Sequence, residues 1–212
     1  MGRGFDVEAA MERINSLGED AEKVLKALTA DAKKRTPGWI AKEITKVYGV
    51  KKGEITGNKI GKVIVQGKSF KDVKIAYEGR LLTHTHFSMS PKTPKEGSTY
   101  TLKATVIKGQ RKTLGQIKKL TKKQRAVLGL NFTRSGQQNS EKSPIMLMRA
   151  NGGQYLPFQR KSHDRNDIDV IRTLSLPQMV SGNRTKVFIQ AAIDEGLTKR
   201  LDHHMQRYMN KK

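Results

Sequence analysis

The sequence predicts an α+β protein in which a small antiparallel sheet is bracketed by an N-terminal pair of helices and a long C-terminal helix. Apolar residues recur at steps of three and four at both ends of the chain, which is the period of an amphipathic helix. In much of the middle, apolar and polar residues alternate, which is the period of a half-buried strand. Helices that flank such strands define the α+β class.

The N-terminal segment, residues 1–58, is predicted to be helical. Thr36 followed by Pro37 is a typical N-cap and first helical residue, so the helical pattern should be divided at this point. The predicted elements are a helix over residues 7–32, a second over residues 36–48, and either a third helical turn or a loop over residues 50–56.

The central body, residues 59–182, is predicted to be rich in β-strands and to carry a basic loop over residues 108–125. Alternating residues predict strands over 60–65, 73–77 and 101–107, and a hairpin of 145–149 with 155–160. The sequence Asn151-Gly152-Gly153 lies between the two hairpin strands and is typical of a tight turn.

The C-terminal segment, residues 183–212, shows the clearest helical pattern. Its apolar residues form one stripe over residues 185–210, and Asn183 is a suitable N-cap. The three segments together are expected to form one compact domain, because 212 residues is below the length at which a single core must divide.

The chain is strongly basic. Its 42 Lys and Arg outnumber 19 Asp and Glu, which gives a formal net charge of +23, and residues 91–130 alone hold eleven basic residues and one acidic residue. This charge favours a polyanionic neighbour, nucleic acid first, or an acidic protein surface. The absence of cysteine excludes disulfides, thiolate nucleophiles and Cys-ligated metals. No apolar run approaches the length of a membrane span, so a soluble protein made in the cytoplasm, with no membrane partner, is expected.

The basic loop contains the candidate residues for contact with DNA or with an acidic ring of protein. They are Lys108, Arg111, Lys112, Lys118, Lys119, Lys122, Lys123 and Arg125. Part of this stretch has helical spacing, which would give one apolar stripe and one cationic face. It has no aromatic residue for base stacking, so any nucleic acid would be bound through its phosphates and without sequence preference. A solvated lysine face with no ligand explains the pattern equally well.

No residue pattern predicts catalysis. His84 and His86 would share one face of a strand, as a metal pair does, but a polar strand face also explains them. Asp164, Asp167 and Asp169 are spaced as Mg²⁺ ligands of a nuclease could be, although a loop neutralised by its own arginines is the simpler interpretation. We therefore expect a protein that is not an enzyme and that holds no cofactor and no metal.

Residues 36–57 support an alternative function. A helix, a turn at Tyr48-Gly49-Val50 and the basic pair Lys51-Lys52 resemble a helix-turn-helix that would bind nucleic acid. Glycines at 53, 57 and 61 leave little length for a recognition helix, and a packed helical corner is the other interpretation.

Four segments in the C-terminal third carry a family resemblance. They are Phe158-Gln159-Arg160, Arg165-Asn166-Asp167-Ile168, Ser175-Leu176-Pro177-Gln178-Met179-Val180 and Lys199-Arg200-Leu201-Asp202-His203. In order and spacing they resemble the minor tail protein Z family of long-tailed bacteriophages, the tail completion proteins. Residues 39–52 are similar to the early helix of that family and to the segment that follows this helix, so the resemblance extends over nearly the whole chain.

The resemblance implies a structural virion protein at the head-proximal end of the tail, which helps tails join heads and accept DNA. It implies as partners other phage tail and neck proteins, further copies in a ring that is hexameric by the sixfold symmetry of the tail, and genomic DNA passing non-specifically through the lumen. Synthesis would take place in the cytoplasm of the bacterial host. The candidate assembly contacts are Phe158, Arg160, Pro177, Gln178, Met179, Arg200 and Leu201.

Overall fold

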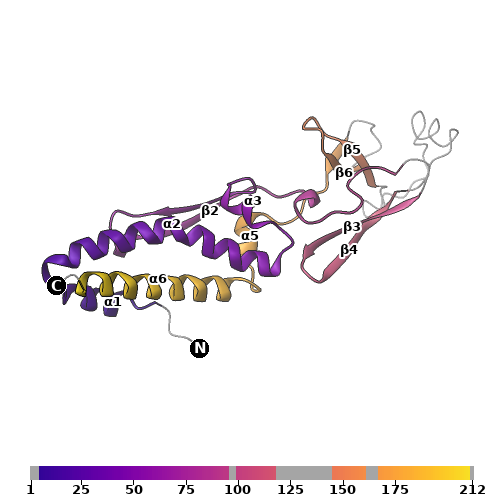
Figure 1. Cartoon of the computed structure of the whole chain (residues 1–212). Coiled ribbons are helices and arrows are strands. Elements are labelled where there is room, and N and C mark those ends of the chain that lie inside the picture. The colour runs from indigo at the N-terminus through magenta and orange to yellow at the C-terminus, as the bar shows by residue number, and fades with distance from the viewer. Residues whose placement is uncertain (1–4, 96–98, 118–144, 161–166, 211–212) are drawn as a thin grey trace. The chain divides into compact units, whose positions relative to one another are not determined.

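The structure is a computed structural model that describes residues 5–95, 99–117, 145–160 and 167–210 (Figure 1). The predicted α+β class is confirmed, but the strands form three small antiparallel sheets and not one. The chain divides into two compact units, residues 1–81 with 174–212 (unit 1) and residues 82–173 (unit 2). These limits differ from the expected boundaries after residues 58 and 182, because the first strand pair packs with the helices.

Unit 1 contains most of the helices and one strand pair. In chain order its elements are α1 (Val7–Asn15), the 3-10 helix η1 (Gly18–Asp20), α2 (Ala21–Val47), α3 (Lys52–Thr56), β1 (Lys62–Gln66), the 3-10 helix η2 (Phe70–Asp72), β2 (Lys74–Glu78), α5 (Leu176–Ser181) and α6 (Lys186–Met209). Strands β1 and β2 pair antiparallel, from Lys62 opposite Glu78 to Gln66 opposite Lys74. Both strands were predicted to within two residues.

The division of the N-terminal helices was predicted at the wrong place. The chain breaks at Gly18, whose φ of +61° is one that glycine adopts without strain, while Pro37 lies inside α2. A proline in a helix interior removes one backbone hydrogen bond and typically ends or kinks the helix. Here Thr36 and Ile40, on either side of it, are both buried, so packing of α2 against its neighbours outweighs the local preference of proline.

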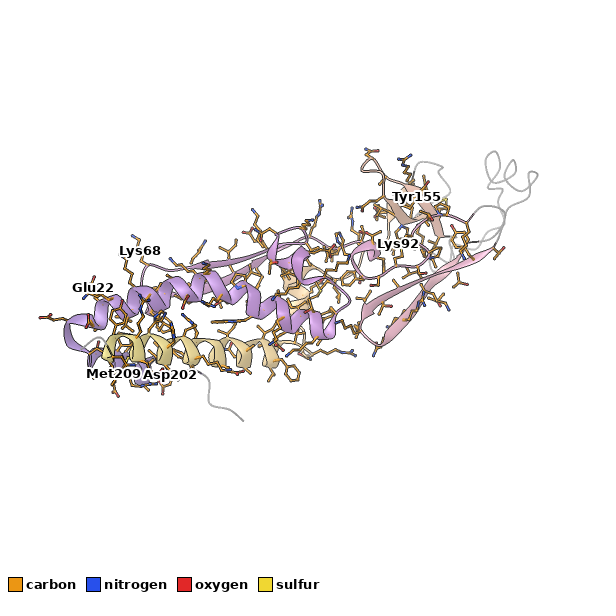
Figure 2. All side chains as sticks on the ribbon, viewed as in Figure 1. Glu22, Lys68, Lys92, Tyr155, Asp202 and Met209 are labelled. Atoms are coloured by element: carbon orange, nitrogen blue, oxygen red, sulfur yellow. The ribbon has the colours of Figure 1, made fainter. Side chains whose placement is uncertain are left out.

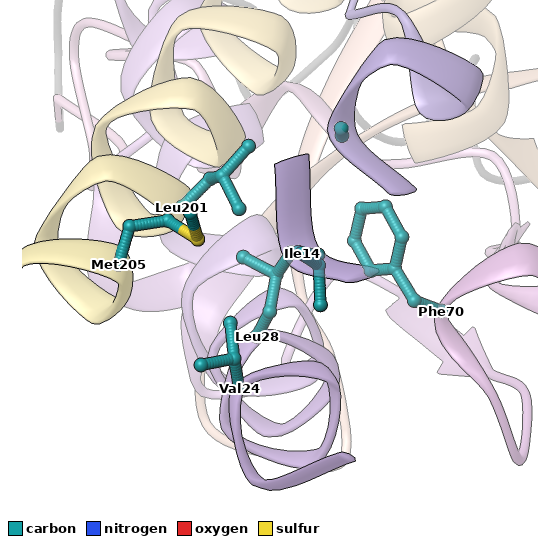
Figure 3. Close-up of a cluster of buried hydrophobic side chains, with 7 residues drawn as sticks. Ile14, Val24, Leu28, Phe70, Leu201 and Met205 are labelled. Carbon is teal, nitrogen blue, oxygen red and sulfur yellow. The ribbon is translucent and has the colours of Figure 1, made fainter. Parts of the chain in front are cut away.

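One core cluster of unit 1 lies where α1, α2 and α6 meet. Its buried members are Ala10, Ile14, Val24, Leu28, Phe70, Leu201 and Met205 (Figure 3). Helices α2 and α6 run antiparallel and lie close together: a Cβ added at Gly196 of α6 would lie 2.7 Å from the ring of Trp39 in α2. Glycine at position 196 therefore permits the close approach of the two helices.

The segment before α6 is shaped by two hydroxyl side chains. Ser175 caps α5, because its hydroxyl accepts from the backbone N–H of Gln178 while the Gln178 side chain accepts from the Ser175 N–H at 2.8 Å. The N-cap position of α6 is Thr185 and not Asn183 as expected. Thr185 is fully buried and its hydroxyl donates to the carbonyl of Met179, so burial of the chain between α5 and α6 decides where α6 begins.

The described residues of unit 2 form β-strands and one short helical turn. Its elements are the 3-10 helix η3 (His84–His86), β3 (Tyr100–Ile107), β4 (Gln110–Ile117), β5 (Ile145–Arg149), β6 (Tyr155–Arg160) and β7 (Ile168–Val170). Strands β3 and β4 form one hairpin, and β5, β6 and β7 form a three-stranded sheet in that order. The bounds of β5 and β6 are those predicted from the sequence.

Candidate functional site

The described part of the basic loop is the β3–β4 hairpin. Lys108 lies in its turn beside Gly109, which has a φ of +77°, and Arg111 and Lys112 lie on β4; all three side chains are exposed. The expectation of helical spacing is wrong here, because residues 110–117 pair with β3 as a strand. The remaining candidates, Lys118, Lys119, Lys122, Lys123 and Arg125, lie outside the described residues.

The hairpin distributes its cations over two faces. Arg111 and Lys112 are neighbours on a strand and so point to opposite sides. In the register of the hairpin, Lys112 is opposite Ala104. Lys103, an exposed residue of β3, is opposite Thr113, which lies two residues from Arg111 on β4, so Lys103 is on the face of Arg111 and not on that of Lys112. The described part therefore does not form the single cationic face that was expected. Exposed cations of this kind bind phosphate or carboxylate groups without reading a base sequence.

Several predicted assembly contacts are in fact used inside unit 1. Met179 is fully buried and Leu201 is 2% exposed, so neither side chain reaches another molecule. Gln178 caps α5, and Pro177 stands at the start of that helix. Burial argues against Met179 and Leu201 as contacts between subunits, whereas Pro177, which is half-buried, and Gln178, which is exposed, stay predicted contacts.

The two predicted contacts in unit 2 lie on β6. Phe158 is half-buried and pairs in register with Met146 on β5 and Val170 on β7. Arg160 ends β6 opposite Ile168. Phe158 thus occupies the central strand of the sheet, where its first role is to join the neighbouring strands.

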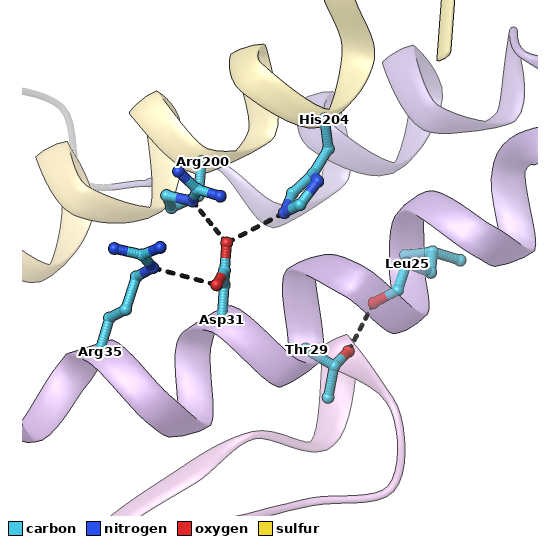
Figure 4. Close-up of polar contacts among 6 residues, drawn as sticks. All are labelled: Leu25, Thr29, Asp31, Arg35, Arg200 and His204. Carbon is cyan, nitrogen blue, oxygen red and sulfur yellow. Dashed lines mark hydrogen bonds and ion pairs between the residues drawn. The ribbon is translucent and has the colours of Figure 1, made fainter. Parts of the chain in front are cut away.

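Arg200, the remaining predicted contact, belongs to a network around Asp31 that joins α6 to α2 (Figure 4). Arg200 donates to one carboxylate oxygen of Asp31, and Nε2 of His204 donates to the same oxygen at 3.0 Å. Arg35 donates to the other oxygen at 3.0 Å. The Asp31 side chain is only 16% exposed, so the four groups form a largely enclosed ionic contact.

The network changes the pKa of Asp31. Burial raises the pKa of this carboxyl, but the hydrogen bonds from Arg35, Arg200 and His204 outweigh burial and lower it from 3.8 to about 2. No local pattern in the sequence indicates this network, because Asp31 and Arg200 are 169 positions apart.

We expect the network to make stability depend on acid pH. Because the folded-state pKa of Asp31 lies below its unfolded value, its contribution is fully present above pH 3.8 and is lost as the pH falls towards 2. After allowance for solvent screening, Asp31→Asn should lower the free energy of unfolding at pH 7 by about 1–2 kcal/mol. Urea denaturation at pH 7 and pH 3 measures this difference. The exposed Glu22→Gln is the control, and an equal loss in both variants would contradict the assignment.

The histidines considered as a metal pair do not share a strand. His84 and His86 lie in η3 and not on a strand. His84 is buried, its Nδ1 donates to the carbonyl oxygen of Ile171 at 3.3 Å, and burial lowers its pKa. Of the adjacent pair on α6, His204 binds Asp31 and His203 is exposed. The described part of the chain contains no group of three or more His, Asp or Glu side chains arranged as metal ligands.

The acidic segment proposed as the nuclease alternative is only partly described. Asp164 lies outside the described residues. Asp169, on β7, accepts from the backbone N–H of Val170 at 3.1 Å, and Asp167 precedes that strand. A local backbone contact of this kind shapes the chain and does not itself provide a metal site.

The helix-turn-helix alternative over residues 36–57 is met only in part: α2 ends at Val47, and α3 begins at Lys52 after a short turn. Thr36 is buried in the middle of α2 and does not begin a helix. The candidate recognition helix, α3, has five residues, about 7.5 Å of helix axis. A recognition helix must enter the major groove with several residues, and α3 is too short for that role.

Comparison with known proteins gave no assignment: no family model, no curated protein and no solved structure matches the chain. Among the helices that the structure describes, none combines the length and the apolar character needed to cross a membrane.

Proposed function

We propose that this chain is a structural, non-enzymatic tail-completion protein of a long-tailed bacteriophage. In this proposal it lies at the head-proximal end of the tail in the virion, where it joins other tail and neck proteins and enables head–tail joining. It forms a homo-oligomeric ring, a hexamer if it follows the symmetry of the tail, and genomic DNA passes through its lumen without sequence-specific contact.

The observation that carries the proposal is the role of the segment 175–180, which bears one of the four motifs of the family resemblance. Its Ser and Gln form the capping box of α5, and Leu176, Met179 and Val180 are buried. Residues of these types at these positions serve folding and not chemistry. A motif used in this way supports kinship with a family of structural proteins.

The charge of the chain supports the same proposal. A net charge of +23 favours binding to a polyanion, and the cations of the β3–β4 hairpin are exposed. The hairpin has no base-reading helix and no aromatic cluster, so its cations would contact DNA through the phosphates alone. Contact of that kind suits a channel through which DNA passes without sequence preference. An acidic protein ring at the neck would be an equally suitable neighbour.

Labelling of virions tests the location. An antibody against the chain, viewed by negative-stain electron microscopy, should mark the junction of head and tail, and inactivation of the gene should leave full heads and separate tails. Antibody previously absorbed with the purified protein is the control. A label at the distal tip of the tail would overturn the proposal.

A further inference from the structure

The first turn of α6 carries an exposed apolar pair. Val187 and Phe188 are 71% and 61% exposed, more than any other large apolar side chain that the structure describes. Arg184 and Lys186, both exposed, flank them. We call Arg184, Lys186, Val187 and Phe188 the α6 patch. Adjacent exposed apolar residues with a charged rim are typical of a surface that binds a protein.

The α6 patch is suited to an acidic partner. The first turn of α6 contains no acidic residue, and Thr185 provides no side-chain cap. The positive end of the helix dipole therefore adds to the charges of Arg184 and Lys186. A partner that covers Phe188 and presents carboxylates would match both properties of the patch.

The chain itself presents such a surface on α1. Six of its nineteen acidic residues lie within the first 22 positions, although the whole chain is strongly basic. On α1 the exposed residues Val7, Glu8 and Glu12 form what we call the α1 patch. Glu8 and Glu12 are four positions apart and therefore on one side of the helix, where like charges repel unless a cation lies between them. Arg13, which follows Glu12 in the sequence, is instead paired with Asp202 at 2.7 Å.

The two patches of one copy lie apart. The contact of Arg13 with Asp202 holds α1 beside the C-terminal half of α6, and Figure 2 shows Asp202 and Met209 near the end of that helix. Asp202 is fourteen residues beyond Phe188, about 21 Å along the helix axis. Val7 is six residues from Arg13 along α1, about 9 Å, so the α1 patch of the same copy stays at least about 12 Å from Phe188 along α6. The α6 patch of one copy therefore meets an α1 patch on another copy.

We propose that the α6 patch of one copy docks on the α1 patch of a second copy, head to tail. Arg184 and Lys186 then face Glu8 and Glu12, and Phe188 packs against Val7. Contacts between two different surfaces repeat from copy to copy, and they either close into a ring or continue as a filament. The inference rests on the proposed function only for the expectation that the assembly closes.

Charge reversal on each patch tests the pairing by sedimentation velocity of the full chain. We expect Arg184→Glu with Lys186→Glu to weaken self-association at least about tenfold, and Glu8→Lys with Glu12→Lys to do the same, because each places like charges in contact. All four changes in one chain should restore association, since the opposite charges then face each other again. Circular dichroism confirms that each variant is folded.

Two substitutions on α6 test the apolar part. Phe188→Ser should weaken association, while Met209→Ser, 59% exposed at the other end of the same helix, should leave it unchanged. A wild-type chain that remains monomeric at every concentration, or a four-residue combination that does not restore association, would overturn the inference. If the chain is monomeric in solution but its antibody still labels the neck of the virion, the inference fails while the proposed location at the head-proximal end of the tail stands. An oligomer of the expected kind found at the tail tip would overturn the proposed function alone.

Discussion

Leu201→Ala should lower the free energy of unfolding by about 2–5 kcal/mol, the range measured for large-to-small substitutions in protein cores. Leu201 is 2% exposed and lies in the cluster with Ile14, Leu28 and Met205. Removal of its branched end loses apolar burial and leaves a cavity between α1, α2 and α6, which relax only in part. Thermal or urea unfolding followed by far-UV circular dichroism measures the loss.

The matched control for Leu201 is Met209→Ala on the same helix. Met209 is 59% exposed, so its truncation should change stability by less than about 0.5 kcal/mol. The experiment also separates the two roles considered for Leu201. If Leu201→Ala abolished self-association but left stability intact, the sequence-based prediction of a subunit contact would be right and the core assignment wrong.

Gly61→Ala should destabilise unit 1 by more than about 2 kcal/mol, because the new side chain combines backbone strain with overpacking. Gly61 precedes β1 with a φ of +149°, which residues with a Cβ rarely adopt. A Cβ here would lie 2.4 Å from the carbonyl oxygen of Glu78 and 3.0 Å from carbons of Leu176. The oxygen belongs to the backbone of β2, so relief requires a shift of the strand or of α5.

Gly53→Ala provides the comparison for Gly61. Gly53 lies in α3, and a Cβ added there meets nothing within 4 Å. The substitution should stabilise the protein by up to about 1 kcal/mol, because alanine favours the helix and restricts the unfolded chain. Urea midpoints of the two variants should thus move in opposite directions, and equal midpoints would contradict the close approach at Gly61.

The parts of the fold predicted best are those with strong local signals. The hairpin of β5 and β6 has the predicted bounds, because alternating residues and the Asn-Gly-Gly turn lie within one short segment. The bounds of α6 are predicted to within one residue by its long apolar stripe. In both cases the determining interactions are between residues near each other in the chain.

The parts predicted wrongly are those where distant residues decide. Local rules place a helix start at Thr36 and Pro37, but α2 continues through them because its face on both sides is buried against other elements. The basic loop shows a similar failure, since pairing with β3 makes residues 110–117 a strand in spite of their partly helical spacing. Helix propensity is worth at most about 0.7 kcal/mol for most residues and roughly 3 kcal/mol for a proline, and burial and strand pairing outweigh both here.

By itself the sequence determined the α+β class, the positions of most helices and strands, the excess of positive charge and the absence of thiol chemistry. Only the tertiary structure decided which of these residues are available to a partner. Arg200 and Leu201 are neighbours, and the sequence predicts both as assembly contacts. In the structure Leu201 lies in the core and Arg200 binds Asp31, whereas Phe188 on the same helix is exposed. Burial depends on which elements pack together across more than a hundred positions, and periodicity along one helix does not contain that information.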